Sequence, residues 1–263
     1  MLEMPENWTR LQKLLFQFDE PTSRLYHVNI LSSLALILIV LFILARQQKT
    51  PFGTLLRRWV LRKKYWWNHS TKQDYLIYFL NALFKSFLLV PLFECSFVIS
   101  QAVIRFLVRF SDGDILNIPV NNVYLLAFTL GVFAWDDFLR FFHHWLMHKV
   151  PFLWEYHKVH HSAVIMTPLT ELRQHPLELF LFPFFIALAT APLYAFTFWL
   201  FGESINLYYF WSFPFFLMVT FSTIGHLRHS HVNIGANRFW AHIIQTPAHH
   251  HIHHSADSKH FDT

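Results

Sequence analysis

Residues 28–45 read VNILSSLALILIVLFILA, a run that contains no Asp, Glu, Lys or Arg. Comparable uncharged runs recur at residues 118–135, 179–201 and 204–224. About 18 or more consecutive apolar residues are enough for a helix that crosses the hydrocarbon core of a bilayer. The repeated runs therefore predict a membrane protein built from helices.

The amino-acid composition favours the same fold class. Hydrophobic residues make up 54% of the chain and charged residues only 14%, whereas a soluble domain usually carries about 25% charged residues. We expect an all-α integral membrane bundle of about four to five transmembrane helices, organised as one domain over residues 1–263. The expected apolar helices cover residues 28–45, 75–107, 118–142, 177–201 and 204–228. The second of these is long for one crossing, so that a tilted or kinked helix and a re-entrant hairpin are both open.

The net charge of +5 lies mostly between the first two apolar segments. Residues 46–72 interleave Arg and Lys with Trp and Tyr, a pattern typical of a cytoplasmic loop at the membrane interface rather than of nucleic-acid binding. With this loop inside, residues 143–176 and 229–263 are also cytoplasmic and form a histidine-rich cap. The single cysteine, Cys95, predicts no intramolecular disulfide.

Most of the 19 histidines lie in the second half of the chain, in four groups. The groups read HHWLMH (143–148), HKVHH (157–161), HLRHSH (226–231) and HHHIHH (249–254). Residues three or four apart share one face of a helix, and a neutral imidazole is the commonest metal ligand in proteins. Each group therefore predicts two or three imidazoles directed at one point. Isolated or adjacent histidines are interpreted as interface or neighbouring residues: His27, His69, His242 and His260 as isolated, His143, His249 and His251 as adjacent.

The number and kind of ligands point to a redox centre with two metals. About eight to ten imidazoles exceed the four to six ligands of one ion. A hydrolytic zinc site would normally offer an HExxH motif, which the sequence lacks, whereas iron suits imidazole and oxygen chemistry. The alternative is a histidine-rich metal-binding protein or metal transporter. Transporters place ionisable ligands near the bilayer midplane, whereas these groups fall at helix ends.

From about Asp136 to the C-terminus, the motifs HKVHHS, RQHPLE, LRHSH and TPAHHHIHHS, with Asp137 before the first histidine group, resemble the fatty acid hydroxylase and sterol desaturase superfamily of membrane di-iron oxygenases. The resemblance implies these iron ligands: His144, His148, His157, His160, His161, His250, His253 and His254. It also implies one or two ligands from LRHSH, with His229 the first choice, His231 the second and His226 a neighbour. His175, Glu178 and Asp137 are implied to orient ligating imidazoles through their other ring nitrogen.

The resemblance further implies an oxidoreductase that hydroxylates or desaturates a lipid such as a sterol, a fatty acyl chain or an ether lipid. Two iron ions and O2 would take part, and zinc, which binds more tightly than ferrous iron, is expected as a replacement in purified protein. Electrons must come from an external ferredoxin, b-type cytochrome or reduced pterin, because the sequence holds no Rossmann fingerprint and no ferredoxin-like cysteine pattern. Relatives usually continue past the last histidine group, so the cap is expected to be either truncated or shorter here.

Overall fold

The computed structural model describes residues 27–202, 209–210, 213–214, 227–232, 234–242 and 245–260. The regular secondary structure of the described chain is helical, as the sequence predicts, apart from one short pair of strands. It divides into two compact units. Unit 1 comprises Met1–Ala82, Val159–Gln174 and Phe216–Thr263, and unit 2 comprises Leu83–Lys158 and His175–Phe215.

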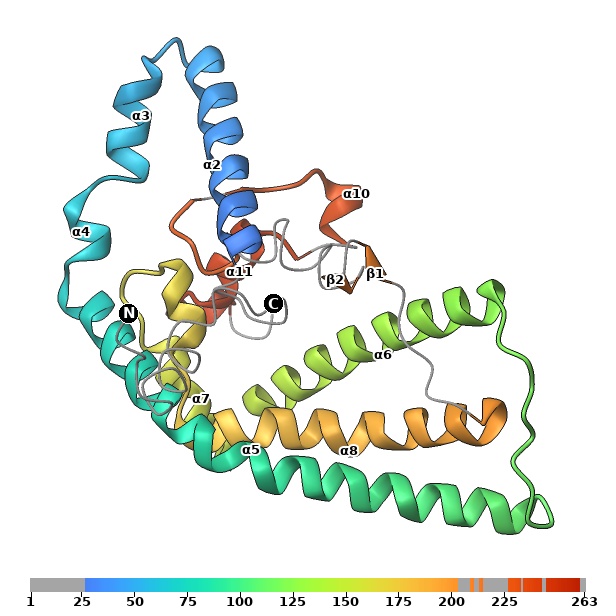
Figure 1. Cartoon of the computed structure of the whole chain (residues 1–263). Coiled ribbons are helices and arrows are strands. Elements are labelled where there is room, and N and C mark those ends of the chain that lie inside the picture. The colour runs from blue at the N-terminus through green and yellow to red at the C-terminus, as the bar shows by residue number, and fades with distance from the viewer. Residues whose placement is uncertain are drawn as a thin grey trace, which may run out of the picture. The chain divides into compact units, whose positions relative to one another are not determined.

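Unit 1 contains two antiparallel helices and a set of short elements. Helices α2 (His27–Gln47) and α3 (Phe52–Trp59) lie side by side (Figure 1). They pack through a small core of Leu41, Ala45 and Leu55. The other elements are α4 (Lys63–Trp66), the start of α5 (His69–Phe110), the end of α7 (Pro151–His161), η1 (Pro168–Leu172), α10 (Arg238–Ala241), α11 (Pro247–His253) and η3 (Ser258–His260).

Unit 2 is a bundle of long helices. Helix α8 (Pro176–Phe201) lies between α5 and α6 (Asn122–Lys149), as Figure 1 shows. Side chains of both neighbours donate to α8 carbonyls close to Pro192. The Ser100 hydroxyl donates to the Ala191 carbonyl at 3.4 Å, and the Trp135 indole donates to that of Ala189 at 3.2 Å. Such donors help an apolar helix to tolerate an internal proline.

Local sequence signals set the ends of these helices. The Asn121 side chain caps α6 by accepting from the backbone N–H groups of Val123 and Tyr124, at 2.9 and 3.0 Å. Helix α8 ends at Gly202, whose φ of 72° is left-handed. The left-handed φ strains any other residue at Gly202, and a Cβ there would lie 2.0 Å from the Asn117 Oδ1 atom, so that this side chain would have to move.

Two of the described helices are long and apolar enough to cross a membrane. They are Ile30–Gln47 of α2, with a mean hydropathy of 2.3, and α8, with a mean hydropathy of 2.0. Helices α2, α5 and α6 also expose large apolar side chains, of which Phe110 is 81% exposed, as a membrane protein does toward lipid. The larger number of spans and their orientation stay predictions.

The structure decides between the two alternatives for residues 75–107. Helix α5 runs without a break through 42 residues, so the segment is a single helix and not a hairpin. At 1.5 Å per residue it is about 63 Å long, roughly twice the thickness of a hydrocarbon core. Part of α5 must therefore extend beyond any membrane that it crosses.

The apolar helix predicted at 204–228 lies largely outside the described residues. Where the structure does describe this segment, it differs from the prediction. β1 (Tyr209–Phe210) and β2 (Phe213–Pro214) pair as antiparallel strands. Aromatic side chains favour extended structure, and Pro214 lacks the N–H that a helix interior needs. A run of apolar residues does not by itself separate a helix from a strand.

Candidate metal centre

Unit 1 brings four imidazoles together, which we call the four-histidine cluster. His160 lies in the last turn of α7, His229 in the segment 227–232, His250 on α11 and His254 at the end of α11. The four ligand atoms all lie within 4.8 Å of one another. The first three residues are buried and His254 is half-buried. Three stretches of chain that are far apart in sequence thus converge at one point.

The contacts within the four-histidine cluster run from Nε2 to Nε2. These atoms are 2.9 Å apart between His160 and His229, 2.7 Å between His229 and His250, and 3.0 Å between His250 and His254. Hydrogen bonds cannot satisfy all three contacts. A neutral imidazole nitrogen offers either one N–H or one lone pair. The Nε2 atoms of His229 and His250 each lie against two other nitrogens, so one proton or one lone pair would have to serve two contacts.

A metal ion resolves this conflict, because it accepts all four lone pairs at once. Two nitrogens bonded to one ion at about 2.1 Å lie roughly 3.0 Å apart at a right angle and roughly 3.4 Å apart at a tetrahedral angle. The observed separations of 2.7 to 3.0 Å approach the first of these values. The donor set of the four-histidine cluster therefore fits a transition metal.

Burial keeps these imidazoles in the form that binds a cation. It lowers the pKa of His229 well below the usual 6.5, and the neighbouring imidazoles of His250 and His160 act in the same direction. Burial likewise lowers the pKa of His250 to about 2 and also lowers the pKa of His254. The three rings are neutral at pH 7, so their lone pairs are available to a metal.

Local sequence explains how α11 presents two of the ligands. Thr246 caps the helix by accepting from the His249 backbone N–H at 3.4 Å, and Pro247 occupies the first helical position. His250 and His254 are four residues apart and share a face. His251 points elsewhere, with its Nε2 against the Ser230 carbonyl.

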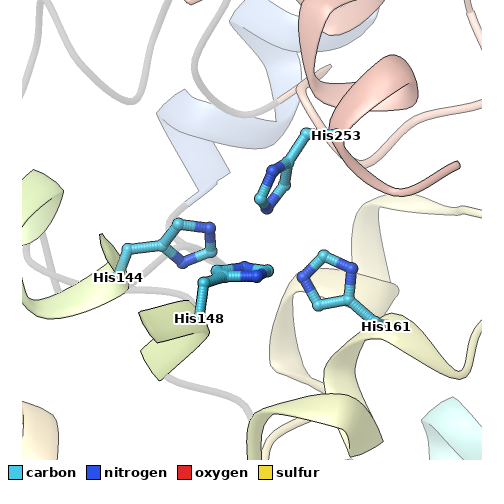
Figure 2. Close-up of side chains that lie close together, drawn as sticks. All are labelled: His144, His148, His161 and His253. Carbon is cyan, nitrogen blue, oxygen red and sulfur yellow. The ribbon is translucent and has the colours of Figure 1, made fainter. Parts of the chain in front are cut away.

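A second set of imidazoles lies within unit 2, the α6–α7 triad of His144, His148 and His157. Each pair of ring centroids in the triad is 4.8 Å apart, and Figure 2 shows His144 and His148 extending from α6. The His157 Nδ1 is 2.9 Å from Glu178 Oε1, with both side chains buried. An ionised carboxylate only accepts, so Nδ1 carries the proton and Nε2 keeps its lone pair for a ligand.

His161 and His253 form a further pair in unit 1. Their ring centroids are 4.9 Å apart, and both side chains are drawn in Figure 2. Both rings also contact His254, at 4.2 and 5.5 Å between centroids. Nine of the ten predicted ligands, His229 among them, thus belong to the four-histidine cluster, the α6–α7 triad or this pair.

The tenth predicted ligand, His231, lies outside these sets. Its ring stacks on Tyr65 with a centroid separation of 4.0 Å, and its Nε2 faces the Trp59 carbonyl, which makes Nε2 a donor. The ring therefore fastens the segment 227–232 to the end of α3. His226, the other neighbour in LRHSH, lies outside the described residues.

His143 is a core residue of unit 2. It packs against Phe182 and Phe185, with centroids 5.0 and 5.8 Å away, and burial lowers its pKa to about 4. This placement favours His144 over His143 as the ligand of the first group. His242 is exposed and contacts the Arg238 carbonyl of its own helix, as expected for an isolated histidine.

The predicted orienting residues are placed differently from one another. Glu178 contacts His157 as described above. His175 caps α8, where its Nδ1 accepts from the Leu177 backbone N–H at 3.1 Å, so that its role is to start the helix that carries Glu178. Asp137 is exposed and no hydrogen bond joins it to an imidazole in the described chain. The orienting role of Asp137 therefore stays a prediction.

Two polar residues beside the four-histidine cluster were missed by sequence reasoning. Glu171 Oε1 lies 3.8 Å from the His229 Nδ1, and the backbone carbonyl of Arg173 lies 3.3 Å from the His160 Nδ1. In the sequence, no periodic spacing relates Glu171, the single carboxylate of TPLTELR, to His229, which lies 58 positions later. The available signal was the charged pair Glu171 and Arg173, close to the apolar segment 177–201.

The buried imidazoles could hold a metal ion, and two of the described helices are apolar and long enough to cross a membrane, which together are the features of a metal-binding membrane protein. A model of the family described as fatty acid hydroxylase matches residues 128–262, which is more than half of the chain. The chain therefore belongs to the fatty acid hydroxylase family, and the resemblance predicted from the motifs is confirmed. No curated protein and no solved structure matches it.

Proposed function

We propose that this chain is a membrane-bound di-iron oxygenase that hydroxylates or desaturates an unactivated C–H bond of a lipid. Sterols, fatty acyl chains and ether lipids are the candidate substrates. The observation that carries the proposal is the convergence of four imidazole Nε2 atoms in unit 1. In a member of the fatty acid hydroxylase family, which acts on lipids by oxidation, such a site is best explained as the redox centre.

The number of histidines supports two metal ions. The four-histidine cluster offers four of the four to six ligands that one ion takes. Three further imidazoles, those of the α6–α7 triad, supply ligands to a second ion in this proposal, and His161 and His253 stay predicted ligands. Iron, when bound to these imidazoles, supplies the oxygen and electron-transfer chemistry that oxidation of a C–H bond requires.

The residues of the chain hold and orient the ligands. Glu178 fixes the proton of His157 on Nδ1, and the Arg173 carbonyl does the same for His160, so that both Nε2 lone pairs face outward from their rings. Burial of the four-histidine cluster excludes water, which strengthens electrostatic interactions at the site. Electrons are supplied by an external ferredoxin, b-type cytochrome or reduced pterin in this proposal.

Metal transport explains the four-histidine cluster less well. A transporter places its ionisable ligands near the bilayer midplane, often on interrupted spanning helices. None of the four ligands lies on α2 or α8, the two described helices that can cross a membrane. We further propose a multi-pass topology with the histidine clusters on the cytoplasmic side, because the basic segment 46–72 favours that side.

Metal content and lipid oxidation test the proposal together. Elemental analysis of the detergent-purified chain should find about two transition-metal ions per folded chain. Cells that express the wild type should accumulate an oxidised lipid that cells with the His160→Ala variant lack. Growth under 18O2 then separates hydroxylation, which adds the label, from desaturation, which removes hydrogen without adding oxygen. Folded protein without any bound transition metal would overturn the proposal.

A further inference from the structure

The segment Thr167–Arg173 of unit 1, which we call the support segment, contacts two ligands of the four-histidine cluster. Its last residue, Arg173, offers its backbone carbonyl to the His160 Nδ1 at 3.3 Å. Two residues earlier, Glu171 places Oε1 at 3.8 Å from the His229 Nδ1. Both contacts reach the ring nitrogen opposite the Nε2 that faces the cluster, which is where an orienting group must act.

The support segment is fixed by a fully buried ion pair. Arg173 is 1% exposed and Asp74, in the second turn of α5, is 0% exposed. The Arg173 Nε donates to Asp74 Oδ1 at 2.5 Å, and the Thr170 hydroxyl donates to Oδ2 at 3.0 Å. Both carboxylate oxygens are therefore engaged by residues of the support segment.

The remaining guanidinium donors reach two serines on either side. Nη2 donates to the Ser70 carbonyl at 2.5 Å and to its hydroxyl at 3.0 Å, and Nη1 donates to the Ser162 hydroxyl at 3.0 Å. Ser162 directly follows the histidines of α7 in sequence. Arg173 thus connects the start of α5, the end of α7 and the support segment through one planar group.

Stability alone is a weak reason for such a pair. Removing two charges from water is so costly that apolar residues of similar volume often stabilise a fold as well or better. An arginine whose Nε, Nη1 and Nη2 atoms are all hydrogen-bonded supplies directional geometry instead. Here that geometry fixes the backbone on which the Arg173 carbonyl and the Glu171 side chain are carried.

His229 also needs an acceptor for the proton on its Nδ1. Among the contacts described, only the support segment offers one. With Nε2 directed at a metal, the neutral ring carries its proton on Nδ1. The residue is 5% exposed, and its Nδ1 has no hydrogen-bond partner within the described part of the chain. A buried N–H is costly without an acceptor. A movement of roughly 1 Å would bring Glu171 Oε1 into hydrogen-bond range.

We propose that the support segment is a positioning device for the four-histidine cluster, in which Glu171 accepts the His229 Nδ1–H and the Asp74–Arg173 ion pair holds the segment in place. The inference rests on the proposed function only in requiring that the four-histidine cluster binds a transition metal. Glu171 then acts on His229 as Glu178 acts on His157, one carboxylate in each unit.

Cobalt binding to the full-length, detergent-purified protein tests this role, because Co2+ reports its ligand field in the visible spectrum. We expect Glu171→Gln to lower the Co2+ affinity by about 10- to 100-fold and to shift the cobalt bands, while the melting temperature of the metal-free protein stays unchanged. Glu155→Gln is the matched control, because Glu155 is an exposed carboxylate that pairs only with Lys158 in the described chain. It should leave affinity, spectrum and melting temperature unaltered.

Asp74→Asn tests the ion pair separately. The variant should lower both the melting temperature and the Co2+ affinity of the protein that remains folded, because Arg173 loses its charged partner. Wild-type affinity in folded Asp74→Asn would overturn the role of the ion pair. Wild-type affinity and spectrum in Glu171→Gln, or a loss of metal-free stability that accounts for its weaker binding, would overturn the role of Glu171. Failure of the wild type itself to bind Co2+ would instead refute the proposed function.

Discussion

Replacing His250 by alanine should disable the four-histidine cluster, because this side chain occupies the middle of the set. Its Nε2 lies 2.7 Å from that of His229 and 3.0 Å from that of His254. Four-ligand protein sites bind zinc with about 10 to 16 kcal/mol at pH 7. An equal share for each ligand is roughly 2.5 to 4 kcal/mol, which corresponds to a loss of about 100- to 1000-fold in affinity.

The assay is a competition titration of the purified protein with a chromogenic chelator, using Zn2+ as the probe. Two histidine variants provide controls. His242→Ala removes an exposed ring that contacts only its own helix among the described residues, and it should bind Zn2+ as the wild type does. His231→Ala removes the stack on Tyr65 and should reduce thermal stability more than metal affinity. If folded His250→Ala kept its affinity within about threefold of the wild type, the geometric assignment of the ligands would be refuted.

Three other predictions follow from the same geometry. Metal-free protein should lose stability as the pH falls below about 6.5, because burial holds the pKa of the cluster histidines below that value and the unfolded chain then binds more protons. Melting experiments from pH 8 to 5 should show a fall in the free energy of unfolding of up to about 1.4 kcal/mol per pH unit for each histidine, and a flat profile would contradict this. Glu178→Gln should lower metal affinity by about 10- to 100-fold, whereas Asp137→Asn should change it little, and chelator titration of both variants would expose the reverse order. Single cysteines at the exposed positions Lys63 and Asp257, in a background without Cys95, should be labelled from the same, cytoplasmic side of the membrane, and labelling from opposite sides would refute the topology.

Local periodicity let the sequence predict much of the fold and the kinds of ligand. Uncharged runs of helix-spanning length predicted α2 and α8, because the length of an apolar run relates directly to bilayer thickness. Spacings of three and four residues predicted that His250 and His254 share a face, because a helix has 3.6 residues per turn whatever surrounds it. Neighbours in sequence are thus neighbours in space, and no knowledge of the chain path is needed.

The tertiary structure alone decided which residues of distant segments meet. His160 contacts His229 across 69 residues, and the choice of His229 over His231 depends on which ring faces that partner. The path of the chain also places Glu171 beside His229 and leaves Asp137 exposed. Orienting contacts join side chains whose separation is set by loops and by buried pairs such as Asp74–Arg173, and no periodicity of the sequence encodes that path.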